Sequence, residues 1–464
     1  MQATVVLATL GSLGDLHPFI ALGRALRARG ANVVMACASE YRDKVEGADL
    51  VFRAVRPSFA DLERRLGMEP AELTSAMLAR NDFLLRDVLM PHLRQSYDDM
   101  ADILAGADLL VASSLAFGAR LAAERQGLPW VGVALQPMMF LSAFDAPVIP
   151  HAEWLSALLR RLGHIPTGWV LALAKLVVAR QLRPVHALRN AIGLAPTGVN
   201  PLFGGQFSAN GAIGLYSPLL GEARRDFPPA ALIAGFAVFD GVCFAGGGES
   251  GPGMLEAGLE KFLNAGVAPL IFTLGSLIVN SPGKFFRESA AAAKLMRRRA
   301  VLLVGEGACE RYAELRSSDI YIGGYAPHSL LFPRAAAIVH QGGIGTLAQA
   351  LHSGRPQLIV PHYGDQADNA ARAIRLGVAL SLAPHRYRAA RVARRLLRLT
   401  GSADHVSRAG AVRRRLADED GAATAAAFLM NRLESNVGAS RPQPPDGSNP
   451  TAGPQPATRH RGFS

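Results

Sequence analysis

Short apolar runs alternate with helical patterns along the first half of the chain. The runs TVVLATL, NVVMACA, LVFRAV, DLLVASS and PWVGVAL have the length and composition of buried strands. Between them, apolar residues recur at helical spacing, and two such segments end on Gly30 and Gly127, as C-capped helices do. Strands that alternate with helices are typical of βαβ units. The pattern predicts a Rossmann-like α/β domain with a parallel sheet over residues 1–240.

The pattern changes after Pro137, where residues 138–195 are apolar and helical with no clear strand. Such an insertion could line a hydrophobic substrate pocket, because ligands of α/β domains bind outside the carboxyl ends of the strands. It could equally cover the core, and the sequence favours neither role. The stretch between Arg161 and Lys175 is too short to span a bilayer, yet it leaves open a peripheral contact with a membrane.

A second alternating region follows a segment rich in glycine. Residues 241–260 have the composition of an interdomain linker. The runs APLIFTLGSL, AVLLVGEG, IYIGGYA, AAIVHQGG and PQLIVPHY then predict a second Rossmann-like domain over residues 261–434. Residues 435–464 are rich in proline, glycine and serine without apolar periodicity, and we expect this tail to be disordered.

The charge and the cysteine content indicate which partners and which cellular compartment to expect. The formal net charge of +12 fits a phosphate-bearing partner, and much of it lies in one arginine-rich stretch, residues 386–398. A single aromatic residue, Tyr387, lies among these arginines, which favours a solvated helix face over a nucleic-acid surface. The three cysteines are far apart, and the N-terminus lacks the basic region of a signal peptide. We therefore expect a protein of the reducing cytoplasm that binds no nucleic acid.

The most informative motif is HQGGIGT, at the end of the strand AAIV. His340 ends the strand, Gly342, Gly343 and Gly345 allow close approach of the backbone, and Thr346 lies in the first turn of a helix. Exposed backbone N–H groups and the positive end of a helix suit a diphosphate. A ring N–H of His340 and the hydroxyl of Thr346 can add hydrogen bonds to phosphate oxygens.

The next strand leads to GDQADN, which brings Asp365 and Gln366 beside the phosphate turn of a parallel sheet. A carboxylate and an amide side by side suit the hydroxyls of a sugar. As a helix cap alone, GDQADN would need no ligand, but its conjunction with HQGGIGT favours a donor site for a nucleotide sugar.

The run from Gly324 to GDQADNAAR is similar to the donor-binding signature of family 1 glycosyltransferases of GT-B fold. Within that family it most resembles the bacterial branch with rhamnolipid rhamnosyltransferases, sterol glucosyltransferases and antibiotic glycosyltransferases. The resemblance extends from the first strand to about Arg432. It implies two Rossmann-like domains facing each other across a cleft.

The resemblance also implies roles for individual residues at the donor site. His340 and Thr346 would hold the diphosphate, and Asp365 with Gln366 the sugar hydroxyls. The resemblance places Tyr325 on the nucleobase and the main chain of Ala326 at the edge of the base. Ser276 would lie on a loop that reaches the phosphates. Many plant members use a glutamate to bind the ribose, and Ala348 stands at that position here.

A second motif, GSLGDLHP, follows the first strand. Asp15 directly precedes a helix and could be only an N-terminal cap. The motif, however, resembles the GSxGD turn of the same bacterial branch, in which the aspartate occupies the position of a catalytic histidine in plant and animal relatives. Asp15 is therefore the predicted general base and His17 the second candidate. Ser113 and Ser114 stand where relatives carry an aspartate that orients a histidine base, which weakens the case for His17.

The leading hypothesis is an inverting, metal-independent hexosyltransferase without a cofactor. It would move a hexose or deoxyhexose, such as rhamnose, from a UDP- or dTDP-sugar to a hydroxyl of an apolar lipid, sterol, terpenoid or polyketide. A non-catalytic helper of a partner glycosyltransferase is the alternative. A nicotinamide-dependent oxidoreductase fits poorly, because the first turn is GSLGD rather than G-x-G-x-x-G.

Overall fold

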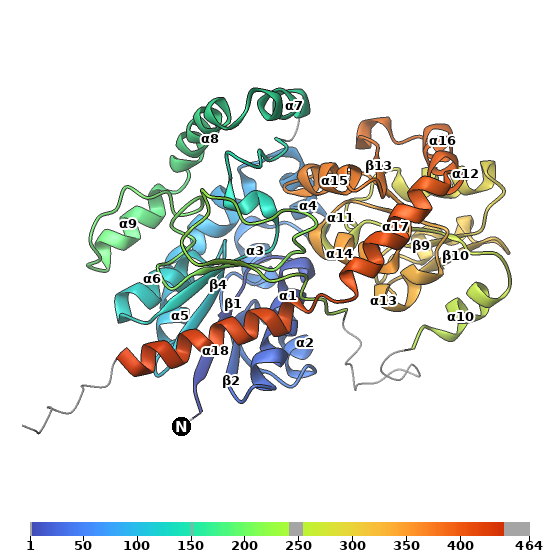
Figure 1. Cartoon of the computed structure of the whole chain (residues 1–464). Coiled ribbons are helices and arrows are strands. Elements are labelled where there is room, and N and C mark those ends of the chain that lie inside the picture. The colour runs from blue at the N-terminus through green and yellow to red at the C-terminus, as the bar shows by residue number, and fades with distance from the viewer. Residues whose placement is uncertain (1, 150–151, 241–253, 440–464) are drawn as a thin grey trace, which may run out of the picture.

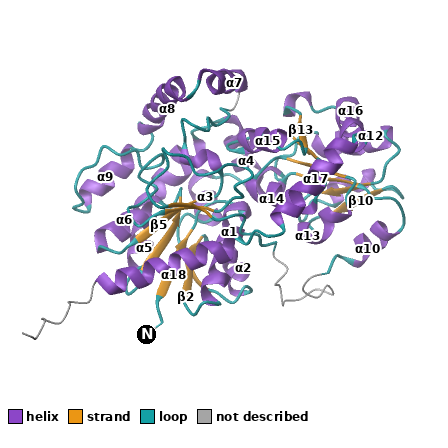
Figure 2. Cartoon of the chain, in the orientation of Figure 1, coloured by secondary structure: helices purple, strands orange, loops and turns teal. Residues whose placement is uncertain are grey.

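The computed structural model describes residues 2–149, 152–240 and 254–439. Two parallel sheets, each flanked by helices, stand side by side (Figures 1 and 2). The prediction of two Rossmann-like α/β domains is confirmed. Most of the predicted linker and residues 440–464 of the predicted tail lie outside the described residues. Within the linker region, helix α10 already begins at Ala257, and residues 435–439 continue the last helix.

The N-terminal sheet has seven strands in the order β3-β2-β1-β4-β5-β6-β7, and each adjacent pair is parallel. The strands are β1 (Thr4–Ala8), β2 (Asn32–Cys37), β3 (Val51–Ala54), β4 (Leu109–Ser113), β5 (Trp130–Ala134), β6 (Ala212–Gly214) and β7 (Ala231–Ile233). The first five match the apolar runs in the sequence. The last two are only three residues long, too short to give a periodic signal.

Helices of the N-terminal half cover this sheet and extend beyond it. They are α1 (Leu13–Arg27), α2 (Arg42–Glu46), α3 (Phe59–Leu66), α4 (Pro70–Ala79), α5 (Leu93–Ile103), α6 (Phe117–Gln126), α7 (Glu153–Leu162), α8 (His164–Ala179) and α9 (Arg183–Ala191). In the described part of the chain no single helix is long and apolar enough to cross a membrane. The pair α8 and α9, bent by 62°, passes that test of length and composition only when taken together.

The C-terminal sheet has six strands in the order β10-β9-β8-β11-β12-β13, again all parallel. They are β8 (Leu270–Thr273), β9 (Ala300–Leu303), β10 (Ile320–Gly323), β11 (Ala337–His340), β12 (Gln357–Ile359) and β13 (Ala379–Ser381). The helices are α10 (Ala257–Asn264), α11 (Gly275–Ile278), α12 (Phe285–Leu295), α13 (His328–Leu331), α14 (Ile344–Ser353), α15 (Gln366–Arg375), α16 (Ala389–Thr400), α17 (Ala403–Leu416) and α18 (Gly421–Ala439).

The last helix returns to the first domain. Although α18 follows the C-terminal sheet in sequence, it lies along α1 (Figure 1), and its side chains Ala425, Leu429 and Leu433 join the core beside that helix. The predicted C-terminal domain reached residue 434, so its final stretch packs on the N-terminal half. The chain thus crosses between the domains twice.

A buried ion-pair network also joins the two domains. Arg372 of α15 donates through Nε to Asp368 and through Nη1 to Asp145 of the N-terminal half, both at 2.6 Å, and its side chain is 1% exposed. Asp368 also accepts the backbone N–H of Val148 at 2.9 Å. Because a buried charge that loses its partner is costly, this network favours the arrangement of the domains in which the pairs stay closed.

Candidate active site

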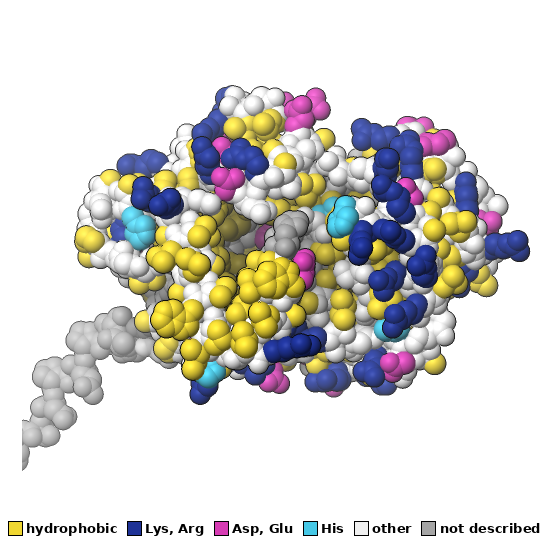
Figure 3. All heavy atoms as spheres, turned by 90° about the horizontal axis from the view of Figure 1, so that it is seen from above, with side chains coloured by type: hydrophobic (Ala, Val, Ile, Leu, Met, Phe, Trp, Pro, Cys, Tyr) yellow, Lys and Arg dark blue, Asp and Glu magenta, His cyan; other side chains and the backbone are white. Residues whose placement is uncertain are grey.

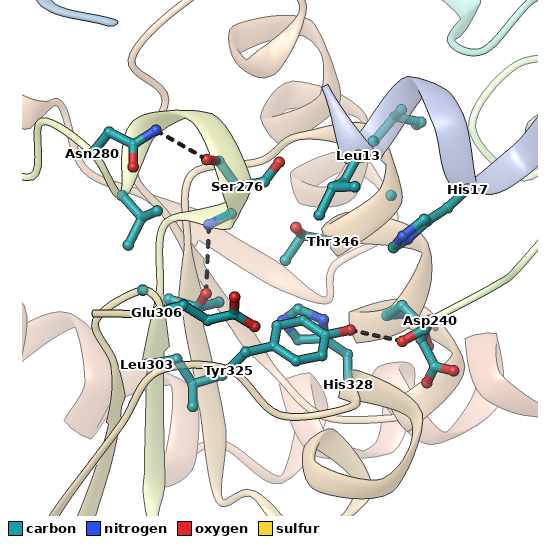
Figure 4. Close-up of a pocket in the computed structure, with 18 of the residues that line it drawn as sticks. Leu13, His17, Asp240, Ser276, Asn280, Leu303, Glu306, Tyr325, His328 and Thr346 are labelled. Atoms are coloured by element: carbon teal, nitrogen blue, oxygen red, sulfur yellow. Dashed lines mark hydrogen bonds between the residues drawn. The ribbon is translucent and has the colours of Figure 1, made fainter. Parts of the chain in front are cut away.

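A cavity of about 620 Å³ lies between the domains at the carboxyl ends of both sheets. Figure 4 shows its walls: α1 contributes Leu13 and His17 from one side, and Ser276, Tyr325 and Thr346 face them from the C-terminal domain. Gly345 lines it as well. Five sequence-predicted site residues therefore meet in one cavity, although they come from opposite halves of the chain.

The HQGGIGT turn builds the floor of the cavity. Helix α14 begins at Ile344, and its N-cap, Gly343, offers no side chain to the N–H groups of the first turn. Gly342 has φ +91°, and a Cβ there would stand 2.7 Å from Cγ2 of Ile359. Thr346, in that first turn, faces the cavity. An uncapped helix N-terminus beside a hydroxyl can accept an anion.

The contact of His340 with a phosphate stays a prediction, because in the structure its ring is engaged within the protein. It is fully buried, its Nδ1 accepts the N–H of Gly342 at 3.1 Å, and its Nε2 lies 2.9 Å from Oε1 of Gln357. This pairing places the proton on Nε2, and burial lowers the pKa of the ring to about 4, so the ring is neutral at pH 7. Both nitrogens are occupied, and His340 fixes the shape of the glycine turn.

Asp365 and Gln366 lie behind that turn and do not line the cavity. Asp365 accepts from Nδ2 of Asn369 at 2.6 Å, and the same amide donates to the carbonyl of Gly342. Oε1 of Gln366 accepts two backbone N–H groups of its own loop, at 2.8 and 3.2 Å. Their contact with a sugar therefore stays a prediction. The structure shows these side chains holding two turns together.

Asp15 belongs to a capping box at the start of α1. Its Oδ2 accepts the backbone N–H of Ser12 at 2.8 Å and the Ser12 hydroxyl at 3.2 Å. Burial nevertheless raises the pKa of the carboxyl to about 6, against an ordinary value near 4. Its negative charge in turn helps to raise the pKa of Asp365, which burial sets at about 7. The two carboxyl groups are thus close enough to interact, although neither lines the cavity.

His17 lines the cavity two residues further along α1. Its Nε2 is buried and has no hydrogen-bond partner among the described residues, and its ring meets Phe239 edge-on at 5.4 Å. Burial lowers the pKa of His17 to about 4, and the positive charge of Lys44 acts in the same direction. A neutral imidazole with an unpaired nitrogen can exchange a proton or a hydrogen bond with a bound molecule.

The predicted nucleobase site is only partly on the cavity wall. Tyr325 is 43% exposed, and its hydroxyl donates to the carbonyl of Asp240 at 2.7 Å (Figure 4). Ala326 is buried and does not line the cavity, so only its main chain could reach a ligand. Ser276, at the start of α11, lines the cavity beside Asn280.

Sequence reasoning missed polar groups that reach the cavity from other elements. His328 begins α13, its Nε2 has no partner among the described residues, and burial lowers its pKa to about 3. Glu306 and Asp240 add carboxylates to the wall, and Lys44 adds an amine. The sequence could have indicated His328, because it lies three residues after Tyr325 in the same motif. Glu306 and Asp240 come from loops and Lys44 from α2, and none of them belongs to a recognisable motif.

The wall supplied by the N-terminal domain is largely apolar. Its members include Leu13, Pro18, Leu135, Leu215, Phe236 and Phe239. No described residue of the insertion at 138–195 lines this cavity, so a contribution of the insertion to a substrate pocket stays a prediction. The strand ends and α1 provide the apolar wall instead.

No group of three or more His, Cys, Asp or Glu residues suited to a metal ion occurs in the described part of the chain. The absence of a required metal and of a cofactor stays a prediction. The groups available to an anion are the first turn of α14, Thr346 and the loop at Ser276.

Two family models match the chain. Residues 5–140 match the glycosyltransferase family 28 N-terminal domain, and residues 298–434 match the C-terminal domain of erythromycin biosynthesis protein CIII-like proteins. The two matches cover the two motifs that follow β1 and β11. Each half of the chain that contributes a wall of the cavity thus matches one of these two domain families.

Known proteins resemble the chain over most of its length. It is 31% identical to an O-mycaminosyltylonolide 6-deoxyallosyltransferase of Streptomyces fradiae over 82% of this chain and 85% of that protein. It is 27% identical to a sterol 3-beta-glucosyltransferase of Arabidopsis thaliana, over 78% of this chain and 55% of the plant protein. The structure of glycosyltransferase VinC in complex with dTDP superposes with a TM-score of 0.62 at 19% identity, over 93% of this chain and all of VinC.

Proposed function

The chain belongs to the GT-B glycosyltransferases whose members include antibiotic and sterol glycosyltransferases, and from this we propose that it transfers a sugar from a nucleoside diphosphate to a hydroxyl of an apolar acceptor. The observation that carries the proposal is the cavity between the domains. One side offers an uncapped helix N-terminus to a diphosphate, and the other side offers an apolar wall with a carboxyl and an imidazole nearby. UDP- and dTDP-sugars are the donor classes we propose.

The donor would lie with its diphosphate at the first turn of α14. The N–H groups there, the hydroxyl of Thr346 and the loop at Ser276 can stabilise the negative charge that the leaving diphosphate gains. Tyr325 offers a ring to the nucleobase. Since VinC is known in complex with dTDP, a thymidine nucleotide is included among the proposed donors.

The acceptor would lie against the apolar wall of the N-terminal domain. Its hydroxyl oxygen forms a bond to the anomeric carbon as the bond from that carbon to the diphosphate oxygen breaks, on the opposite face, which inverts the configuration. Asp15 takes the hydroxyl proton. Its raised pKa of about 6 makes it a better base than an ordinary aspartate and leaves it mostly ionised at pH 7.

His17 and His328 have a supporting place in this scheme. Each has an unpartnered, buried Nε2 at the cavity and a neutral ring at pH 7. A neutral ring can orient a sugar or acceptor hydroxyl without adding charge. The relatives act, by their names, on O-mycaminosyltylonolide and on sterols, which supports a polycyclic or macrocyclic apolar acceptor for this chain.

The test is release of nucleoside diphosphate by the purified chain with a panel of UDP- and dTDP-sugars, each with and without sterol or macrolide acceptors. We expect one donor to be consumed only when an acceptor is present, and NMR of the product to give the anomeric configuration opposite to that of the donor. Binding of no nucleotide sugar would overturn the donor site and favour a non-catalytic helper. A product of retained configuration would overturn the single-step mechanism alone.

A further inference from the structure

Helix α8 exposes an apolar stripe on the outer surface of the protein. Its exposed residues Ile165, Trp169, Leu173, Leu176 and Val177 recur every three to four positions, which places them on one face of the helix. Their exposed fractions lie between 62% and 77%. The residues buried on the opposite face are Thr167 and Leu171. The helix therefore turns its most apolar side to the surroundings.

Helix α7 extends the same surface. Trp154, Leu158 and Leu162 follow one another at intervals of four residues and are 69%, 42% and 58% exposed. We call the exposed side chains of these two helices the α7–α8 face. Two of the three tryptophans of the chain lie on it. A contiguous apolar surface of this kind marks an interaction site, because it costs free energy in contact with water.

The α7–α8 face is separate from the cavity. No residue of either helix lines that cavity, and in Figure 1 the two helices lie at the outer edge of the N-terminal domain. Figure 3 looks down on this edge and shows hydrophobic side chains gathered on that part of the surface. The face therefore needs an occupant other than the substrates already proposed.

Basic side chains border the apolar stripe. Arg160 and Arg161 lie in the last turn of α7, and Arg180 and Arg183 lie at the junction of α8 and α9. None of these four arginines forms an ion pair with a described carboxylate. Apolar and aromatic residues flanked by unpaired arginines are the composition of helices that lie in a membrane interface.

A second basic surface, formed by arginines on and beside α16, lies on the same side of the protein as the α7–α8 face. Arg386, Arg391, Arg394, Arg395 and Arg398, on and beside α16, line a surface hollow of about 420 Å³. Figure 3 shows a dense field of Lys and Arg side chains beside the apolar region, seen from one direction. Burial lowers the pKa of Arg375 in α15, and the positive charge of Arg160 in α7 acts in the same direction across the two domains.

We propose that the α7–α8 face docks the protein on an anionic phospholipid bilayer, with the arginines of α16 against the headgroups. At 16 residues, α8 is about 24 Å long and lies in the interface rather than across the bilayer. A second copy of this chain, which carries a net charge of +12, would bring like charges together. This docking goes beyond the proposed function and does not depend on it.

The first experiment is sedimentation of the full chain with vesicles, without any sugar donor. One set is phosphatidylcholine alone and the other is phosphatidylcholine with phosphatidylglycerol. We expect binding to the anionic set and a blue shift of tryptophan emission as Trp154 and Trp169 enter the interface. The double variant Trp169→Ser, Leu173→Ser should lose about tenfold or more in vesicle partitioning.

The matched control is Val267→Ser, Leu295→Ser, which removes two residues of similar exposure, 66% and 63%, from the C-terminal domain. It should bind vesicles as the wild type does. Circular dichroism of both variants should match the wild type, because all four side chains are exposed. Wild type that stays in the supernatant with both vesicle sets, or equal loss in the two variants, would overturn the proposal.

The arginines are tested by Arg394→Glu, Arg398→Glu against Arg29→Glu, Arg125→Glu, which changes the net charge equally at the far ends of α1 and α6. Only the first pair should weaken binding, and only to anionic vesicles, with an effect that fades at high salt. Equal effects of both pairs would mean that net charge alone attracts the protein. If the wild type is a dimer that Trp169→Ser, Leu173→Ser dissociates, the face joins two copies and the docking proposal fails.

Discussion

The two strand-to-helix turns at the cavity have the same architecture, but the helix N-terminus is capped in one and uncapped in the other. In both, a parallel strand runs through glycines into a helix, β1 into α1 and β11 into α14. The first turn of α1 is closed by the capping box of Ser12 and Asp15, whereas α14 begins at Gly343 without a side-chain cap. The first N–H groups of α1 are thus closed by side chains, whereas those of α14 are left without a side-chain partner.

The two turns approach each other closely. A Cβ added to Gly345 would stand 3.7 Å from the Cα of Gly14. The two helix ends therefore converge on one point with room for a ligand beside them. The N–H groups left open on α14 can bind an anion, and Asp15 of the opposite turn is the base that we propose.

The largest expected effect comes from separating the two roles of Asp15. Asp15→Asn keeps an oxygen that can accept from Ser12, so the cap and the fold should survive, but the base is lost. We expect kcat to fall by about 10²–10⁴-fold with donor affinity unchanged, measured by nucleoside diphosphate release and by calorimetric titration of donor. Near-normal kcat in this variant would leave Asp15 as a cap only, and His17→Gln would then be the informative variant.

The next effect tests the shape of the open turn. Gly342→Ala adds a Cβ at φ +91° against Ile359 and the carbonyl of Gln366. We expect a loss of about 2–4 kcal/mol in stability or in donor binding, measured by thermal unfolding with and without donor. Gly283→Ala is the control, since its φ of +54° carries backbone strain but its Cβ would meet open space. Equal losses in both would show that the strain, and not the packed turn, is responsible.

A smaller effect is expected from the hydroxyl in the first turn of α14. Thr346→Val removes one hydrogen bond to a charged phosphate and should weaken donor binding by about 10–100-fold. Thr346→Ser keeps the hydroxyl and should stay close to the wild type. If both variants bind donor normally, the diphosphate does not lie at this turn, and the contrast between the two helix ends fails.

Much of this arrangement was predictable from periodicity and turn residues. Strands β1–β5 and β8–β12 and the glycine turns after β1 and β11 carry strong local signals, because buried parallel strands are apolar and a left-handed turn needs glycine. The partner of His340 could not be predicted, since Gln357 lies 17 residues away on the neighbouring strand. The sequence HQGG therefore did not reveal that the ring of His340 holds Gln357 and the backbone of Gly342.

The missed features share a physical cause. Apolar periodicity shows that α8 and α18 are amphipathic helices but not what covers them. In the structure α18 packs on α1 across the domain boundary, while α8 turns its apolar face outward. Likewise, GSLGD alone does not show whether Asp15 is a cap or a base, because a capping aspartate can also act as a base when another domain lies opposite it.

The smallest expected effect is a pH dependence that assigns the base. Burial raises the pKa of Asp15 to about 6 and lowers that of His17 to about 4. A base works when deprotonated, so kcat/KM should rise with pH through about 6 and fall about tenfold per unit below it if Asp15 is the base. If His17 is the base, activity should instead hold down to about pH 4.

Asp365 complicates this profile, because its pKa is also raised, to about 7. Asp365→Asn removes that group while an amide can still face Asn369. The limb near pH 6 should persist in this variant and disappear in Asp15→Asn, whose residual activity should be flat. If the loss of activity near pH 6 disappears in Asp365→Asn instead, the titrating carboxyl is Asp365, behind the α14 turn, and not Asp15 in the capped turn of α1. Asp365 would then be the group on which the proton transfer depends.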